Sequence, residues 1–131
     1  MKVVAFNGSP RKDGNTAILI REVFSSLEKE GIETELIQFA GRTIPGCRAC
    51  YTCAQTLNCE CSINNDLVNE SIQKIMDADG VIIGSPTYFS SVSAETKAFI
   101  DRIGVVCRAN GYIFKRKVAA AVVAGRRGGM V

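Results

Sequence analysis

The sequence predicts an α/β fold with a doubly wound parallel sheet. Segments with the pattern of strands alternate with segments of helical periodicity, the central strands are apolar, and loops rich in Gly, Ser, Pro and Asn follow the strands. The chain has 131 residues, of which 47% are hydrophobic, so we expect a single domain with one core over residues 1–131.

The first half of the chain contains two predicted strands and a helix. Residues 2–7 form a short apolar run that ends in a loop of Gly, Pro and Asn, which is typical of a strand followed by a loop. Residues 32–39 alternate apolar and polar side chains, as a strand at a sheet edge does. Between them, apolar residues recur at helical spacing from about Thr16 to Lys29, namely Ile20, Val23, Phe24 and Leu27.

The second half repeats the alternation after a long cysteine-rich loop at 46–62. A helix marked by Val68, Ile72, Ile75 and Met76 precedes an apolar strand at 80–85. The next helix carries Phe99, Ile103, Val106 and Cys107 on one face, and we interpret Cys107 as a small buried hydrophobic residue. The fourth strand is expected at 117–125.

Charge and hydropathy exclude several classes of partner. The 16 Lys and Arg residues against 13 Asp and Glu give a net charge of +3, too small and dispersed to indicate a nucleic-acid or membrane surface. The sequence begins directly with a β-branched run, and eighteen apolar residues never occur together. We therefore expect a cytoplasmic protein, in which clustered cysteines indicate a metal or redox centre rather than disulfides.

Three loops are expected to meet at the carboxyl end of the sheet, where doubly wound folds bind ligands. In the first, Ser9, Asn15 and Thr16 supply side-chain donors, Arg11 adds charge, and a helix N-terminus follows, which suits a phosphate. The spacing matches neither the Walker pattern nor G-x-G-x-x-G, which argues against nucleoside triphosphate hydrolysis. A polar turn that only caps the helix is the alternative for this loop.

The other two loops could hold a flat ligand. Tyr88 and Phe89 place aromatic faces after Ser85 and Pro86, although either ring could instead belong to the core. The segment "AGRRGG", from residue 124, could approach the ligand from the opposite side with its backbone.

The segments "GSPRKDGNT", "GSPTYFSSVSAETKAFIDR" and "AGRRGG" resemble the flavodoxin-like NAD(P)H-dependent FMN reductase superfamily. The cysteine loop resembles that of its iron–sulfur flavoprotein branch. The resemblance implies FMN as cofactor. Its phosphate would be held by Ser9, Arg11, Asn15 and Thr16, and its isoalloxazine would be flanked by Pro86, Thr87, Tyr88 and Phe89. The edge of the ring would be approached by Gly125 and Arg126. One phosphate monoester also suits the single phosphate-binding loop.

Five of the six cysteines lie between residues 47 and 61. Cys47, Cys50 and Cys53 have the C-x2-C-x2-C spacing of a loop that wraps a 4Fe-4S cluster, and we predict such a cluster. Zinc and free or transiently oxidised thiols are the alternatives; zinc is less favoured because its sites usually use separated pairs or histidine, and this chain has no histidine.

The spacing allows either Cys59 or Cys61 as the fourth ligand. The family resemblance favours Cys61, because an acidic pair and a hydrophobic residue usually follow the last cysteine after three residues. Asn65, Asp66 and Leu67 stand in those places, with Asn65 departing from the usual acid.

The leading hypothesis is a flavin-dependent oxidoreductase in which FMN exchanges electrons with the cluster, without a catalytic acid or base. One alternative is an NAD(P)H-dependent FMN or quinone reductase with structural or zinc-binding cysteines, and another is a non-catalytic flavodoxin-like electron carrier. The expected partners are a ferredoxin-like protein or NAD(P)H.

The sequence stops directly after the fourth predicted strand, whereas the resemblance implies a further strand and helix. The expected fold is thus a flavodoxin-like sheet truncated after that strand. The apolar strand "VAAAVVA" would then present an unpaired edge, which favours pairing with another chain. We expect a homo-oligomer, a dimer or larger, in which flavin and cluster of neighbouring subunits come close.

Overall fold

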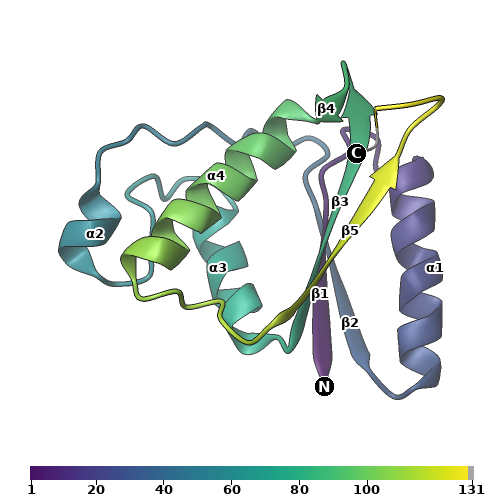
Figure 1. The fold of residues 1–131 in the computed structure, drawn as a ribbon, viewed down its shortest axis with the longest axis horizontal. Coiled ribbons are helices and arrows are strands. Elements are labelled where there is room, and N and C mark those ends of the chain that lie inside the picture. The colour runs from purple at the N-terminus through teal and green to yellow at the C-terminus, as the bar shows by residue number, and fades with distance from the viewer. Residues whose placement is uncertain (130–131) are drawn as a thin grey trace.

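The computed structural model describes residues 1–129, and they form the predicted parallel sheet with helices on both faces (Figure 1). The strands lie in the order β2-β1-β3-β5, and a short β4 pairs antiparallel with the end of β3. Their bounds are Lys2–Asn7 for β1, Glu33–Gln38 for β2, Gly80–Tyr88 for β3, Ser91–Val92 for β4 and Val118–Ala124 for β5. The helices are α1 at Asn15–Lys29, α2 at Thr52–Thr56, α3 at Val68–Asp77 and α4 at Ala94–Ala109.

The sheet separates two apolar layers because successive side chains of a strand point to opposite faces. Ala5 of β1 packs under α1 with Ile20 and Phe24. On the other face, under α3 and α4, the ring of Phe6 lies 4.7 Å from that of Phe99, measured between centroids. Figure 1 shows α1 alone on one side of the sheet, and α3 and α4 together on the other.

The predicted strands and the three longer helices are confirmed, with local differences. The third strand continues through Pro86 to Tyr88 instead of ending at residue 85. Proline is tolerated there because β1 has ended: its last pair with β3 joins Asn7 and Gly84, so Pro86 has no β1 neighbour.

Two other expectations need correction. The cysteine segment is not entirely loop, since it contains the short helix α2. Cys107 is half-buried and not part of the core, because it lies at the margin of the buried stripe of α4 that Phe99, Ile103 and Val106 form.

The strand β5 forms the outer edge of the sheet in the described part of the chain. Its first four residues are exposed, and 73% of the surface of Val118 is accessible. No helix within residues 1–129 is long and apolar enough to cross a membrane.

Candidate functional site

The loop between β1 and α1 is shaped by its own polar groups. The buried Asn7 side chain accepts the N–H of Ser9 at 3.1 Å and donates to the Gln38 side chain at 3.0 Å. The Ser9 hydroxyl in turn accepts the N–H of Arg11 at 3.1 Å. These bonds hold the loop in one conformation before any ligand arrives, which lowers the cost of binding.

The N-terminus of α1 is left without a side-chain cap. Gly14 occupies the capping position, no side chain within residues 1–129 caps the helix with a hydrogen bond, and the first turn contains no acidic residue. The first backbone N–H groups of a helix and its positive dipole end attract anions. The end of α1 is therefore available to an anionic group of a ligand.

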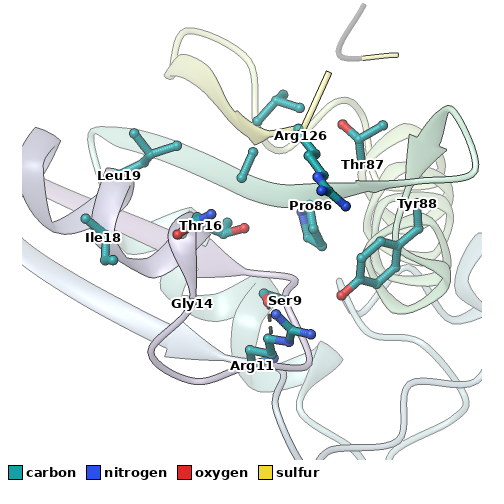
Figure 2. A pocket seen from close by; sticks show the side chains of 14 residues that line it. Ser9, Arg11, Gly14, Thr16, Ile18, Leu19, Pro86, Thr87, Tyr88 and Arg126 are labelled. Carbon is teal, nitrogen blue, oxygen red and sulfur yellow. Dashed lines mark hydrogen bonds between the residues drawn. The ribbon is translucent and has the colours of Figure 1, made fainter. Parts of the chain in front are cut away.

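A cavity of about 600 Å³ opens at this helix end, between the β1–α1 loop and the carboxyl ends of β3 and β5 (Figure 2). Figure 2 shows Arg11 and Arg126 on opposite sides of the cavity, with Pro86 between them. The lining residues are Ser9, Arg11, Gly14, Asn15, Thr16, Ile18, Leu19, Pro86, Thr87, Tyr88, Val123, Ala124, Gly125 and Arg126.

All of the sequence-predicted cofactor residues except Phe89 line this one cavity. Phe89 lies in the tight turn between β3 and β4 with a positive φ of 48°, and its side chain is fully exposed. Sequence reasoning missed the apolar lining from Ile18 and Leu19. Both are exposed apolar residues outside the buried stripe of α1. Apolar residues on the helix face that does not pack on the sheet were the signal that could have revealed them.

Beneath the cavity, a buried hydroxyl network joins the first loop to α4. Ser93 caps α4, donates from its hydroxyl to the Gly8 carbonyl at 2.7 Å, and hydrogen-bonds the Thr96 hydroxyl at 2.8 Å. In contrast, the buried Oγ1 of Thr87 has no hydrogen-bond partner among residues 1–129. Because an unpaired buried hydroxyl is costly, Thr87 is a candidate contact for a polar ligand group.

A second, smaller cavity of about 90 Å³ lies in the cysteine segment, next to α4. Cys59 does not line it, and its N–H donates to the Asn110 side chain at 3.0 Å instead. The backbone of Cys61 is held on both sides by Asn69, which accepts its N–H at 2.8 Å and donates to its carbonyl at 2.9 Å. The cysteines that line the cavity are Cys47, Cys50, Cys53 and Cys61.

The loop around this cavity has an unusual backbone. Ala49, Tyr51, Leu57 and Cys59 all have positive φ, which is uncommon for residues with a side chain. Such conformations persist only where surrounding contacts enforce them, and they are frequent at ligand-binding sites.

The thiols of this cavity differ in acidity. Hydrogen bonds from Ser62, and then from Thr52, stabilise the thiolate of Cys50 and lower its pKa to about 7. Burial raises the pKa of the Cys53 thiol. No three His, Cys, Asp or Glu side chains in residues 1–129 are gathered closely enough to hold a single metal ion.

The wall of the cysteine cavity also contains a buried ion pair. Arg102 of α4 pairs with Asp66, and the side chains of both are almost inaccessible. Despite burial, which opposes the charge, the hydrogen bonds to Asp66 and the nearby Cys61 and Asp66 side chains raise the pKa of Arg102. The guanidinium is therefore a permanent positive charge beside the thiols.

The chain is similar to curated proteins along its whole length. It is 41% identical to an iron-sulfur flavoprotein of Methanocaldococcus jannaschii over 131 residues, covering 98% of this chain and 65% of the relative. It is 32% identical to an iron-sulfur flavoprotein of Methanosarcina thermophila, covering 98% of this chain and 66% of the relative. The chain thus spans about two thirds or slightly less of these relatives.

Solved structures share the flavodoxin-like fold. RosB with bound 8-demethyl-8-formylriboflavin-5'-phosphate matches with a TM-score of 0.77 at 23% identity, covering 98% of this chain and 54% of RosB. An NAD(P)H:quinone oxidoreductase from Methanothermobacter marburgensis also matches with a TM-score of 0.77, at 16% identity, covering 95% of this chain and 64% of that one. The family model of the NADPH-dependent FMN reductases matches residues 1–131. With this full-length match and the identities above, the chain belongs to the NADPH-dependent FMN reductase family.

Proposed function

We propose that this chain is a flavin-dependent oxidoreductase that binds FMN in the larger cavity and a 4Fe-4S cluster in the cysteine cavity, and passes electrons between them. One observation carries the proposal. Four of the clustered cysteines line one small cavity. The loop between β1 and α1 and the end of β3, with Tyr88, line a separate cavity that is large enough for a cofactor.

The larger cavity suits FMN in volume and in chemistry. Ligand pockets of proteins span roughly 300–1,000 Å³, and this cavity is about 600 Å³. Ser9, Arg11, Asn15 and Thr16 would hold the phosphate at the uncapped start of α1. Tyr88 offers a half-exposed aromatic face beside Pro86, where the planar ring would stack.

Polar groups near the ring would come from β3 and β5. The hydroxyl of Thr87 is unpaired within the described part of the chain, and Gly125 and Arg126 follow the end of β5 in the cavity wall. Arg126 would place a positive charge near a ring that becomes anionic on reduction, which favours the reduced flavin.

The smaller cavity suits a group of several atoms better than one ion. A cavity needs a volume of about 10–15 Å³ to hold one water molecule. The cysteine cavity is several times larger, at about 90 Å³. Cys61, and not Cys59, lines it together with the C-x2-C-x2-C thiols. We therefore assign the four cluster ligands to Cys47, Cys50, Cys53 and Cys61.

When bound, FMN exchanges one or two electrons and the cluster exchanges one. The protein's own contribution is to hold the two groups and exclude water from the buried side of each. Helix α4 links the sites: Thr96 lies against Gly8 of the FMN loop, and Arg102, six residues later and about 9 Å along the helix, lines the cysteine cavity.

Purification under argon, followed by iron, sulfide and flavin assays, tests the proposal. We expect one FMN and four iron and four sulfide per chain, with a broad thiolate-to-iron shoulder beside the flavin absorption bands. Wild-type protein free of iron would contradict the cluster, and protein that neither retains nor rebinds FMN would contradict the flavin site.

NAD(P)H as electron donor is a second candidate function, favoured by the matching family of NADPH-dependent FMN reductases. Anaerobic stopped-flow mixing with NADPH, NADH and a reduced ferredoxin distinguishes the candidates. Fast flavin reduction by a nicotinamide supports the reductase, whereas fast reduction only by the protein donor supports the electron carrier. Light scattering tests the proposed homo-oligomer, for which we expect a particle mass of at least two chains.

A further inference from the structure

Helix α4 places a buried arginine with incomplete hydrogen bonding beside the cysteine cavity. Only 1% of the surface of Arg102 is accessible. Its Nη1 and Nη2 groups are fully engaged, whereas its Nε is buried and has no hydrogen-bond partner in the described part of the chain.

The engaged nitrogens fasten both ends of the cysteine loop. Nη1 donates to the Pro45 carbonyl at 3.3 Å, just before Cys47, and Nη2 donates to the Ile63 carbonyl at 2.9 Å, just after Cys61. Asp66 accepts from both Nη1 and Nη2 and neutralises the guanidinium, without which a buried charge would be strongly destabilising. This double attachment fixes the rotamer of Arg102, and so the direction of its Nε–H.

The remaining N–H, that of Nε, has no acceptor among residues 1–129. A buried donor without a partner costs about 1–3 kcal/mol. Nη2 donates to the carbonyl of Ile63, two residues after Cys61, and Arg102 and Cys61 line the same cavity. A neutral thiol accepts hydrogen bonds weakly, whereas a metal-bound thiolate carries negative charge and accepts them well.

We propose that Arg102 is a positioning residue for the cluster, whose Nε–H donates a hydrogen bond to the thiolate of Cys61 once that residue is an iron ligand. The inference rests on the proposed function and deepens it. The bond selects Cys61 as fourth ligand and favours the reduced, more negative cluster, because hydrogen bonds to the sulfur ligands raise cluster reduction potentials.

Arg102→Lys tests the proposal, since lysine keeps the charge but has a single nitrogen that cannot bind Asp66, the two carbonyls and Cys61 together. In a redox titration followed by EPR, we expect the equilibrium constant for reduction of the cluster to fall about tenfold. For a one-electron couple, this corresponds to a reduction potential that is lower by about 59 mV. The FMN potential of the same sample should not move.

Two control variants separate this role from general disruption. Arg48→Lys changes the other arginine of the cavity wall, which is exposed, and should leave the cluster potential unchanged. Asp66→Asn keeps the Nε–H but leaves the buried guanidinium charge uncompensated, so we expect less cluster to assemble, with no fall in the potential of the cluster that does. A purely structural role of Arg102 would instead lower the iron content of Arg102→Lys as well, without a fall in the potential of its remaining cluster.

Pulsed EPR on reduced wild-type protein provides a second measurement if Arg102→Lys fails to assemble a cluster. With arginine labelled with ¹⁵N at Nε, we expect hyperfine coupling to the cluster that persists in Arg48→Lys. Absence of that coupling, or an unchanged potential in Arg102→Lys, overturns the inference while a wild-type cluster still supports the proposed function. Wild-type protein without iron and sulfide would overturn both.

Discussion

Gly8→Ala should destabilise the protein strongly, because Gly8, in the loop between β1 and α1, packs directly against Thr96 of α4. A Cβ atom at this position would stand 1.7 Å from Oγ1 of Thr96 and 3.0 Å from the carbonyl oxygen of Gly84. Ordinary van der Waals contact begins at 3.4 Å, so one of the groups must move by more than 1.5 Å. Thr96 is completely buried and cannot turn outward into solvent.

The size of the effect follows from these contacts. Overpacking of a well-packed site costs about 1–3 kcal/mol. Displacing Thr96 also breaks its 2.8 Å hydrogen bond to the Ser93 hydroxyl, which contributes about 1 kcal/mol more. We therefore expect Gly8→Ala to lower the free energy of unfolding by about 2–4 kcal/mol, a large part of the roughly 5–15 kcal/mol of a typical domain.

Urea unfolding of the apoprotein, followed by circular dichroism, measures this loss as a lower midpoint at an unchanged slope. Gly104→Ala is the matched control: nothing lies within 4 Å of its added Cβ, and in the middle of α4 alanine should stabilise by about 0.5–1 kcal/mol. Combining Gly8→Ala with Thr96→Ala should restore much of the loss by removing Oγ1. A loss below about 1 kcal/mol in Gly8→Ala, or no recovery in the double variant, would refute the packing argument.

Four further predictions concern the cofactors and thiols. Heat should release FMN and not FAD, because the cavity has a single phosphate-type loop; recovery of FAD alone, identified by mass, would contradict this. Cys59→Ala should keep its iron, and iron and sulfide assays would reassign the ligands if it does not. In the apoprotein, alkylation of Cys50 should rise with pH around a midpoint of about 7, and Ser62→Ala should move that midpoint toward 9.0. The variants expected to lose the cluster while retaining FMN are alanine replacements of Cys47, Cys50, Cys53 and Cys61.

The sheet could be predicted because its signals are local. The apolar run of β1 and the alternation in β2 identify strands within a few residues, and helical spacing identifies α1. The end of β3 was mispredicted since Ser85 and Pro86 are typical of loops. Whether a proline is tolerated in a strand depends on whether the neighbouring strand has already ended, which local sequence does not reveal.

The larger cavity could be predicted for a related reason. The carboxyl ends of parallel strands meet at one edge, so loops that follow β1, β3 and β5 must lie together once the strand order is known. The orientation of Phe89 could not be predicted, because the two-residue β4 pairs with the end of β3 and turns this ring into solvent. Ile18 and Leu19 were missed because helix residues outside the buried stripe are ordinarily assumed to face water.

The choice between Cys59 and Cys61 shows what spacing alone lacks. Both cysteines are within reach of a short loop, and only contacts with distant residues separate them. Asn110, at the end of α4, binds the backbone of Cys59, whose side chain lies outside the cavity wall, while Asn69 holds Cys61 against the cavity. The preference for Cys61 in the sequence rested on the acid at position 66, a register taken from family resemblance.

The proposed role of Arg102 would give that register a physical meaning. Asp66 neutralises Arg102, and Arg102 fastens the loop next to Cys61. If Cys61 is the last cluster ligand, as we propose, the acid must follow it by a fixed number of residues for both to meet the same arginine. Were Cys59 the ligand, the two extra residues would move the thiolate away from the guanidinium, and the buried Nε–H would remain without an acceptor. In the proposed arrangement, the distance between cysteine and acid along the chain is set by a side chain that enters from α4, far away in the sequence.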